Sequence, residues 1–298
     1  MIIKWKSKIK NNISLSRFLY IHKVSHKSIK KLKKEGEILI NNKIANLLNI
    51  VSYGDIVTVK LPNENYSNLI FDHHSLNVIY EDNNWLLVNK PYGISSVPGP
   101  NDREGTLVNR INYYMFSHNK KFKAHLITRL DYDTSGIVLV AKNSFVHGLI
   151  QSDIENHNID KEYLALISGN MNKNEGIINL PIGKSKDIYD PRRIVTDQGK
   201  SAITIYHVLK TFNNVSLVHI RLVTGRTHQI RVHFSYLGHP LIGDKLYGGS
   251  SCYGIHRQAL HAWKLTFFDP VDEVKRNFTS KLPDDFCLLI DRLKNGKY

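Results

Sequence analysis

Two carboxylates stand directly ahead of an apolar run near the middle of the chain. Asp131 and Asp133 precede residues 137–141, which read Ile-Val-Leu-Val-Ala. A carboxylate at the start of a buried strand must be paired or hydrogen-bonded to remain charged there, and the hydroxyls of Thr134 and Ser135 could supply such bonds. Two carboxylates at this spacing could serve as a general acid and a general base. The alternative is that both side chains only cap turns of the loop.

A second polar cluster, residues 224–233, gathers arginines and histidines around a predicted helix start. His228 and Arg231 are three residues apart, so a helix would present both on one face. Arg226 precedes this helix, where its guanidinium could reach a carboxylate on another strand. His228 and His233 are five residues apart, which does not fit the i, i+4 spacing of a helical zinc pair. We therefore expect no metal here and hydrogen-bonded, structural histidines.

Composition and charge narrow the class of protein. The 298 residues are 42% hydrophobic and 22% charged, which is typical of a folded globular protein. Lys and Arg total 41 against 26 Asp and Glu, and a formal charge of +15 indicates a polyanionic partner, most often nucleic acid. No apolar run approaches the roughly 20 residues of a membrane-spanning helix, and lysines within the first ten residues interrupt any secretory signal. The two cysteines, Cys252 and Cys287, form neither a disulfide framework nor a zinc knuckle, so we expect free thiols and a cytoplasmic protein.

The positive charge is concentrated in residues 1–62, which hold 13 Lys and Arg and three acidic residues. This asymmetry predicts an anion-binding module beside a more neutral body. Ser25 is the expected N-cap of a lysine-rich helix and Gly36 its end. The elements expected in this module are helices at 14–20 and 26–35 and strands at 37–40 and 56–60. Its candidate RNA contacts are Arg17, Lys27, Lys30, Lys31 and Lys34, and the alternative is a solvated helix with no partner.

The rest of the chain reads as a linker followed by an α+β body. Residues 63–75 are predicted to be the linker, because Pro62 and several Asn and Ser residues break any periodicity. The body, residues 76–298, is expected to hold strands at 76–80, 85–89, 137–141, 163–168, 202–209, 216–223 and 263–267, and helices at 106–116, 145–156 and 227–237, the last capped by Thr227. This pattern predicts a mainly antiparallel, mixed sheet rather than regular βαβ alternation. It contains no P-loop, so no nucleotide triphosphate is expected.

Six motifs occur in the order in which they stand in one family of enzymes. They are Lys90-Pro91-Tyr92-Gly93, Arg129-Leu130-Asp131-Tyr132-Asp133-Thr134-Ser135-Gly136, Lys161-Glu162-Tyr163-Leu164-Ala165, Gly225-Arg226-Thr227-His228-Gln229-Ile230-Arg231-Val232-His233, Gly238-His239-Pro240 with Gly243-Asp244, and Ala259-Leu260-His261-Ala262. Over residues 76–270 the chain resembles an RNA pseudouridine synthase of the large-ribosomal-subunit type. Residues 1–62 resemble an S4 RNA-binding domain, whose αα-β arrangement presents basic helices to structured RNA. That likeness lies in segments 16–19, 28–29, 36–43 and 54–57.

The resemblance implies roles for individual residues. Asp131 matches the essential aspartate of the family, Tyr163 the tyrosine that stacks on the target base, and Arg226 the arginine that pairs with the aspartate. Arg129 matches the arginine of the aspartate loop, which in some members fills the space left by the flipped nucleotide. Thr128 departs from the pattern, because members usually carry His at this position. Thr keeps a hydroxyl but lacks the ring, so this departure concerns local RNA contacts.

The implied reaction is the isomerisation of uridine to pseudouridine in structured RNA. It breaks the N1–C1′ bond, turns the uracil and joins C5 to C1′, and the resemblance implies no cofactor and no metal. The reaction needs a carboxylate, a platform for the detached base and a cation, which Asp131, Tyr163 and Arg226 would supply. The expected substrate is 23S-type ribosomal RNA, with tRNA as the alternative. We expect a monomer without membrane contact.

Two other functions remain open from the sequence. A non-catalytic RNA-binding or ribosome-assembly factor would keep the fold and lose the reaction, although the intact Asp131 argues against it. A glycoside or phosphoester hydrolase could use Asp131 and Asp133, but it gives no reason for the basic N-terminal module. Replacement of Asp131 by Asn separates enzyme from binder, because only catalysis should respond.

Overall fold

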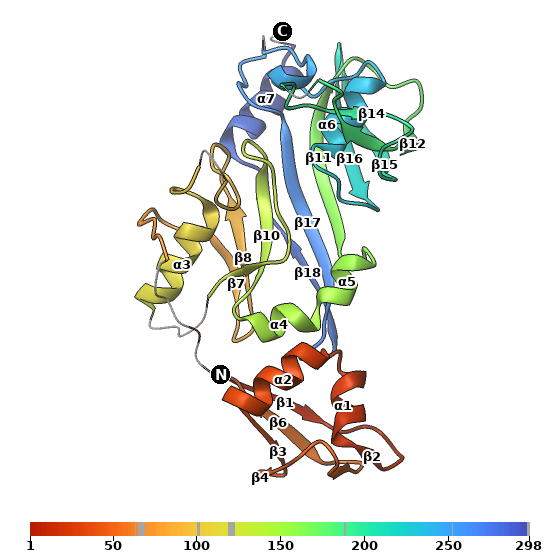
Figure 1. Ribbon diagram of the computed structural model, residues 1–298. Coiled ribbons are helices and arrows are strands. Elements are labelled where there is room, and N and C mark those ends of the chain that lie inside the picture. Colours follow the sequence, from red (N-terminus) through yellow and green to blue (C-terminus); the bar gives the residue numbers. More distant parts are fainter. Residues whose placement is uncertain are drawn as a thin grey trace.

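The structure, a computed structural model, describes residues 1–62, 64, 69–99, 102–118, 123–187, 189–251 and 253–296. Figure 1 shows a small N-terminal module, residues 1–62, below a larger body built around one long sheet. No helix in the described ranges is long and apolar enough to cross a membrane. Cys287 is an exposed free thiol, whereas Cys252 lies outside the described residues.

The N-terminal module is a four-stranded antiparallel sheet with the order β1-β6-β3-β4, covered by two helices. Its strands are β1 (Ile2–Lys6), β3 (Glu37–Ile40), β4 (Lys43–Ile44) and β6 (Ile56–Lys60), with a separate pair formed by β2 (Ile13–Ser14) and β5 (Ile50–Val51). Helices α1 (Leu15–Ile21) and α2 (His26–Glu35) begin at Ser14 and Ser25, whose hydroxyls accept hydrogen bonds from backbone N–H groups in the first turn. Both helices, β3 and β6 confirm the predicted elements.

Strand β1 lies outside the predicted elements, although its pattern is that of a half-buried strand. Ile3 and Trp5 are buried, while Lys4 and Lys6 are exposed. Two of the lysines that interrupt a secretory signal, Lys4 and Lys6, therefore lie on the outer face of a strand, where side chains alternate between the two faces.

The body contains a ten-stranded, mainly antiparallel sheet, which confirms the predicted fold class. Its main path runs β12-β15-β16-β11-β17-β10-β8-β7, with β18 paired to β17 and β9 to β10, and β10 and β17 run parallel. The strands are β7 (Val78–Glu81), β8 (Trp85–Lys90), β9 (His125–Leu126), β10 (Ser135–Ala141), β11 (Asp160–Ser168), β12 (Glu175–Asn179), β15 (Ile203–Phe212), β16 (Val215–Leu222), β17 (Leu260–Asp269) and β18 (Val274–Thr279). All the predicted body strands are present.

Helices lie against the sheet and at its two ends (Figure 1). They are α3 (Leu107–Ser117), α4 (Ser144–Leu149), α5 (Gln151–Glu155), α6 (Gln229–Tyr236) and α7 (Asp284–Lys294), with a 3-10 turn at Lys245–Tyr247 and a small hairpin of β13 (Ile182–Lys184) and β14 (Arg193–Val195). Two predictions are wrong in detail. The helix expected over 145–156 is divided at Ile150, which ends α4 and starts α5. Helix α6 is not capped by Thr227, because its N-cap is His228 in the left-handed conformation, with φ 57°.

The N-terminal module shares one hydrophobic core with the body. The Trp5 ring on β1 packs beside Phe145 on α4 with ring centres 6.5 Å apart, and its indole N–H donates to the carbonyl of Pro270 at 3.4 Å. Lys23 of the module pairs with Asp153 of α5, with 2.6 Å between Nζ and Oδ2. Figure 1 shows α1 and α2 facing α4 and α5 across this junction. The module is therefore packed onto the body and not merely tethered to it.

The predicted linker is anchored at two described positions. Glu64 accepts hydrogen bonds from the backbone N–H groups of Lys123 at 2.9 Å and Ser144 at 3.0 Å. Asp72 accepts a hydrogen bond from Arg110 Nε at 2.8 Å. These bonds fasten the connection to the body and limit how far the module can turn.

Candidate active site

A cleft of about 540 Å³ opens where β10 and β11 begin and β16 ends. Its walls come from segments far apart in the sequence, around 127–134, 154–163 and 222–231. Asp131 is the one carboxylate among the described residues that line the cleft. The positively charged lining residues are Arg129, Lys161, Arg226 and Arg231. This balance of charge suits a polyanionic ligand such as nucleic acid.

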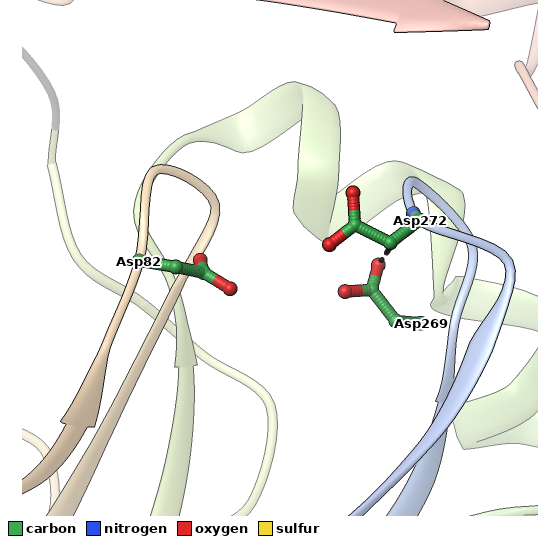
Figure 2. A group of neighbouring side chains, drawn as sticks. All are labelled: Asp82, Asp269 and Asp272. Carbon is green, nitrogen blue, oxygen red and sulfur yellow. Dashed lines mark hydrogen bonds between the residues drawn. The ribbon is translucent and has the colours of Figure 1, made fainter.

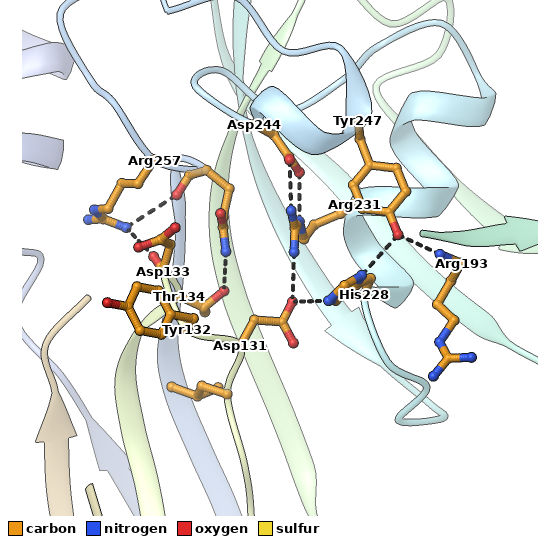
Figure 3. Close-up of polar contacts among 12 residues, drawn as sticks. Asp131, Tyr132, Asp133, Thr134, Arg193, His228, Arg231, Asp244, Tyr247 and Arg257 are labelled. Carbon is orange, nitrogen blue, oxygen red and sulfur yellow. Dashed lines mark hydrogen bonds and ion pairs between the residues drawn. The ribbon is translucent and has the colours of Figure 1, made fainter. Parts of the chain in front are cut away.

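The carboxylate of Asp131 faces a guanidinium that a second carboxylate holds in place (Figure 3). Arg231 Nη1 lies 3.4 Å from Asp131 Oδ2. The same guanidinium donates two hydrogen bonds to Asp244, from Nε at 2.7 Å and from Nη2 at 2.8 Å, and both residues are buried. Burial opposes the charge of Arg231, but the bonds to Asp244 prevail and raise the pKa of the guanidinium. The site thus presents a fixed, permanent positive charge to Asp131.

A histidine approaches the same carboxylate from α6. His228 Nε2 lies 4.0 Å from Asp131 Oδ2, and its Nδ1 lies 2.9 Å from the hydroxyl of Tyr247. That hydroxyl accepts the backbone N–H of Arg193 at 2.8 Å and can donate its own proton to Nδ1. When the hydroxyl donates in this way, a neutral imidazole carries its proton on Nε2, facing Asp131. Burial lowers the pKa of His228, although the charge of Asp131 opposes the shift.

A buried lysine supports the aspartate loop, residues 128–136. Lys90 is fully buried, and its Nζ donates to the carbonyl oxygens of Pro91 at 2.9 Å, Ile94 at 2.7 Å and Tyr132 at 2.9 Å. Burial lowers the pKa of Lys90 to about 7, against the charges of the two nearby aspartates. The three bonds tie the turn after β8 to the loop that carries Asp131.

The other side of the loop is held by the segment leading into β17. Arg257 Nη1 donates to the carbonyl of Asp133 at 3.1 Å, and Gln258 Nε2 donates to the Thr134 hydroxyl at 3.2 Å. At Gly136 φ is +118°, and a Cβ there would lie 2.2 Å from the carbonyl oxygen of Ala262. Only glycine fits where β10 passes so close to β17. The motif that ends in Gly136 therefore has a packing reason as well as a chemical one.

Comparison with known proteins places this cleft in a family. The sequence profile of the family described as RNA pseudouridylate synthase matches residues 84–236, about half of the chain, including most of the cleft. The chain belongs to this family. An uncharacterised RNA pseudouridine synthase of Bacillus subtilis, YjbO, is 39% identical over 256 residues, which is 86% of this chain and 90% of the relative. The ribosomal large subunit pseudouridine synthase D of Blochmanniella floridana is 33% identical over 293 residues, 91% of this chain and 90% of the relative.

A solved structure of another member of this family has a similar fold. The human RNA pseudouridylate synthase domain containing 1 protein superimposes on the synthase with a TM-score of 0.57 at 26% identity, covering 75% of this chain and 96% of that one. The predicted enzyme class, an isomerase that converts uridine to pseudouridine in RNA, is confirmed by these matches. The roles predicted for single residues depend on where the synthase places them.

The arginine that pairs with Asp131 is Arg231 and not Arg226, which corrects the prediction. Arg226 also lines the cleft, but its Nε donates to the carbonyl of Ser201 at 2.9 Å. The reason is the start of α6 at Gln229, which leaves Arg226 in the preceding turn and puts Arg231 in the first helical turn. The sequence did hold one signal for Arg231. Its i, i+3 spacing from His228 predicted that both side chains share one face, and both approach Asp131 in the structure.

The structure places three other predicted residues in or on the cleft. Tyr163 lies on β11 and lines the cleft, and burial, followed by the charge of Asp131, raises the pKa of its hydroxyl. Arg129 is exposed in the same lining. Thr128 lines the cleft as well, and its hydroxyl accepts the backbone N–H of Leu139 at 3.0 Å. The threonine thus fastens the aspartate loop to β10.

The two aspartates of the loop do not form an acid–base pair. Asp131 lines the cleft, whereas Asp133 is absent from the described lining. Figure 3 shows the Asp133 side chain on the side of Arg257 and the Asp131 carboxylate turned toward Arg231. A mechanism that uses both carboxylates on one substrate has no support in this geometry.

Gln229 is a structural residue of the site that the sequence analysis did not single out. Its side-chain oxygen accepts the backbone N–H of Arg226 and the hydroxyl of Thr224, each at 2.9 Å. Its side-chain nitrogen donates to the carbonyl of Ile203 and to the hydroxyl of Thr204, each at 3.0 Å. This buried amide fixes the turn before α6. Its position between His228 and Ile230 in the motif was the only signal available in the sequence.

One group of carboxylates has the spacing of a metal site, at the end of the body next to the N-terminal module. Asp82, Asp269 and Asp272 lie close together between the β7–β8 and β17–β18 turns (Figure 2). The guanidinium of Arg276 lies among these three side chains. Its Nε donates to Asp269 at 2.7 Å, its Nη2 also binds Asp272, and Nη2 lies 3.3 Å from Asp82 Oδ2. One guanidinium contacts all three carboxylates, so they fit an internal ion-pair network better than a metal ion.

Proposed function

We propose that the isomerisation depends on Asp131 and that the substrate is large-subunit ribosomal RNA. The observation that carries the first part is a single carboxylate in the described lining of the cleft, 3.4 Å from the guanidinium of Arg231. An ionised carboxylate at this position can reach the sugar or the base of one bound nucleotide. The second part is supported by the relative named ribosomal large subunit pseudouridine synthase D, which aligns over 91% of this chain. A tRNA is the alternative substrate.

We assign the target base to Tyr163. The ring lies in the cleft on the strand that faces the aspartate loop, and its hydroxyl stays neutral because burial raises its pKa. Stacking of a base on an aromatic ring contributes about 1–3 kcal/mol, which offsets part of the few kcal/mol needed to flip a nucleotide out of folded RNA. Arg129, exposed in the lining, is assigned to the space that the flipped nucleotide leaves.

We propose three regions: an S4-like RNA-binding domain at 1–62, a linker at 63–75 and the catalytic domain at 76–298. The order of α1, α2 and β3 agrees with the αα-β arrangement of such a domain. Every lysine of α2 is exposed, while Ile29 and Leu32 face the core. The proposed RNA contacts are Arg17, Lys27, Lys30, Lys31 and Lys34.

Salt dependence tests the role of this domain. Each phosphate contact contributes roughly 0.7–0.9 to the slope of log affinity against log salt. A triple variant, Lys27, Lys30 and Lys34 each to Gln, should flatten the slope by about two units. Deletion of residues 1–62 is a poorer test, because it would expose the apolar core shared with the body. An unchanged slope would overturn the assignment.

The decisive experiment maps pseudouridines in total RNA. Cells with and without the gene are compared by carbodiimide treatment and primer-extension stops, with wild-type and Asp131→Asn complements. Stops in large-subunit ribosomal RNA that are lost without the gene, and restored by wild type but not by Asp131→Asn, would support both parts of the proposal. The same pattern of stops in tRNA would support the role of Asp131 and overturn the assigned substrate. An unchanged map in every RNA class would favour a non-catalytic binding factor.

We further propose that the synthase acts as a monomer in the cytoplasm, without a metal. The exposed free thiol of Cys287 supports a reducing compartment, and the acidic cluster that Arg276 occupies supports the absence of a metal there. Sedimentation of the purified chain tests the oligomeric state. Activity that survives prolonged treatment with EDTA tests the absence of a metal requirement, and activity lost and restored by a divalent ion would contradict it.

A further inference from the structure

One wall of the cleft gathers three nitrogen-bearing side chains that have no carboxylate partner among the described residues. Lys161 lies near the start of β11, opposite Leu222 near the end of β16, so the turn that follows β16 lies beside it. A Cβ on Gly225 would lie 3.1 Å from Lys161 Nζ, which places the ammonium against this turn. Arg226 is the next residue of the turn, and His157 precedes β11 in the same lining.

The charge on this wall is not compensated within the described part of the chain. Burial lowers the pKa of Lys161, and burial together with the charges of Lys161 and Arg226 lowers the pKa of His157. The guanidinium of Arg226 donates to a neutral carbonyl at Ser201. A half-buried ammonium without an anionic partner is unfavourable, because burial disfavours the charged form. Its presence in the same cleft as Asp131 points to an anion supplied by the ligand.

The geometry of β11 relates this wall to the base platform. Lys161 and Tyr163 are two residues apart on one strand, so both side chains point to the same face. Successive residues on one face of a strand are about 7 Å apart. Both residues line the cleft. A nucleotide with its base at Tyr163 can therefore place a neighbouring phosphate at Lys161.

We propose that Lys161, with Arg226 and His157, forms a phosphate-binding subsite that takes a phosphodiester next to the target uridine. This subsite rests on the proposed function of the cleft and adds an assignment for Arg226, which does not pair with Asp131. It acts on the RNA backbone and does not depend on the sequence of the RNA. Lys161 is thus a substrate-binding residue that holds the strand while Asp131 acts on the nucleoside.

Neutral linkages in the RNA test the subsite. The probes are RNA oligonucleotides that span a uridine converted by the wild-type enzyme, with a methylphosphonate either 5′ or 3′ of that uridine, and the unmodified oligonucleotide. Dissociation constants are measured with Asp131→Asn and with the double variant Asp131→Asn, Lys161→Met. One neutral linkage should weaken binding to Asp131→Asn about 10-fold, the size expected for a charge-assisted contact. The same linkage should have little further effect on the double variant.

Controls separate the subsite from folding and from the proposed function. Lys161→Arg should retain the sensitivity to the neutral linkage, whereas Lys210→Met, a lysine of β15 outside the lining, should leave it unchanged. The subsite would be overturned if the neutral linkage and Lys161→Met weakened RNA binding additively, both for the linkage 5′ of the uridine and for the linkage 3′ of it. It would also be overturned if neither change altered the dissociation constant. Failure of the wild-type enzyme to form pseudouridine in any RNA would instead overturn the proposed function.

Discussion

The guanidinium of Arg231 lies 3.4 Å from the carboxylate of Asp131, in a position set by two hydrogen bonds to buried Asp244. Because the guanidinium is planar and its donors are fixed in a fork, the pair with Asp244 decides where the remaining nitrogen points. Asp131 therefore has a cationic neighbour whose position does not depend on Asp131 itself. A preorganised charge of this kind requires no rearrangement during the reaction.

Removal of Arg231 should slow the chemical step. We expect Arg231→Met to lower the single-turnover rate at saturating RNA about 10–100-fold, because a hydrogen bond to a charged group contributes about 1.5–3 kcal/mol. The affinity for RNA should change less than the rate. Asp244→Asn, which keeps the shape and loses the charge, should give a smaller loss of the same kind. Rates and dissociation constants of these variants check the prediction.

Arg226→Met is the matched comparison for Arg231→Met. Arg226 lines the same cleft but bonds to Ser201, so its loss should weaken RNA binding more than it slows the reaction at saturation. Equal losses of rate in Arg226→Met and Arg231→Met would contradict the distinction between the two arginines.

Lys90 should be needed for the shape of the aspartate loop. Lys90→Met removes three donors and leaves the carbonyls of Pro91, Ile94 and Tyr132 without this partner. Pro91 and Tyr132 are exposed and Ile94 is half-buried, so water can reach these carbonyls, and each lost hydrogen bond costs about 0.5–1.5 kcal/mol. We therefore expect the unfolding free energy to fall by about 3 kcal/mol for the three bonds together. Chemical denaturation measures this loss, and the single-turnover rate should fall with it. Wild-type stability and rate in Lys90→Met would show that the loop holds without the lysine.

The sequence located segments that line the cleft but not the contacts between them. Helix α2 and the strand β10 follow from local capping and apolar patterns, so both were predictable. The choice between Arg226 and Arg231 depended on whether α6 begins at Thr227 or at Gln229, and the buried hydrogen bonds of Gln229 decide this. Such bonds join segments about 25 residues apart and leave no periodic signal.

The contacts between the N-terminal module and the body could not be predicted from local sequence patterns either. Lys23 and Asp153 are 130 residues apart, and Trp5 reaches Pro270 across 265 residues. The sequence showed only that residues 1–62 differ in charge from the rest, which predicts a separate module but not its docking. The docking of the module is set by long-range packing in the hydrophobic core that it shares with the body.

Glu64 should make the stability of the enzyme depend on acid pH. Burial would raise the pKa of this carboxylate, but hydrogen bonds from His125, Ser144 and Lys123 prevail and lower it from 4.5 to about 2. A carboxylate whose pKa is lower in the folded state than in the unfolded state stabilises the fold above its unfolded-state pKa. This stabilisation is lost as the pH falls through the folded-state pKa. We expect the unfolding free energy of the wild type to fall by up to about 3 kcal/mol between pH 4.5 and pH 2 because of this group.

Glu64→Gln is the variant that checks this assignment. Because Gln cannot ionise, the variant should be less stable than wild type near neutral pH, and the difference should shrink below pH 4.5. Urea denaturation at several pH values measures both curves. Parallel curves for wild type and Glu64→Gln would show that the acid dependence arises from other groups.

Lys23 should link the N-terminal module to the cleft. Its pair with Asp153 holds α5, and Asp153 also accepts a hydrogen bond from Asn158 at 3.2 Å, next to the cleft residue His157. Lys23→Met leaves the mostly buried carboxylate of Asp153 without its cation, which is costly. We therefore expect weaker RNA binding, by about 3–10-fold, together with a loss of stability of about 1–2 kcal/mol.

Lys8→Met is the control for this linkage. Lys8 also joins the module to the body, through an ion pair with Glu273, but its side chain is 76% exposed and the pair is remote from the cleft lining. An exposed pair contributes about 0–1 kcal/mol, so Lys8→Met should leave stability and RNA affinity close to wild type. Rescue of RNA binding by Lys23→Arg, which keeps the charge, would separate the pair with Asp153 from the packing of the lysine stem. Indistinguishable behaviour of Lys23→Met and Lys8→Met would mean that the module contributes to the cleft only through its RNA contacts.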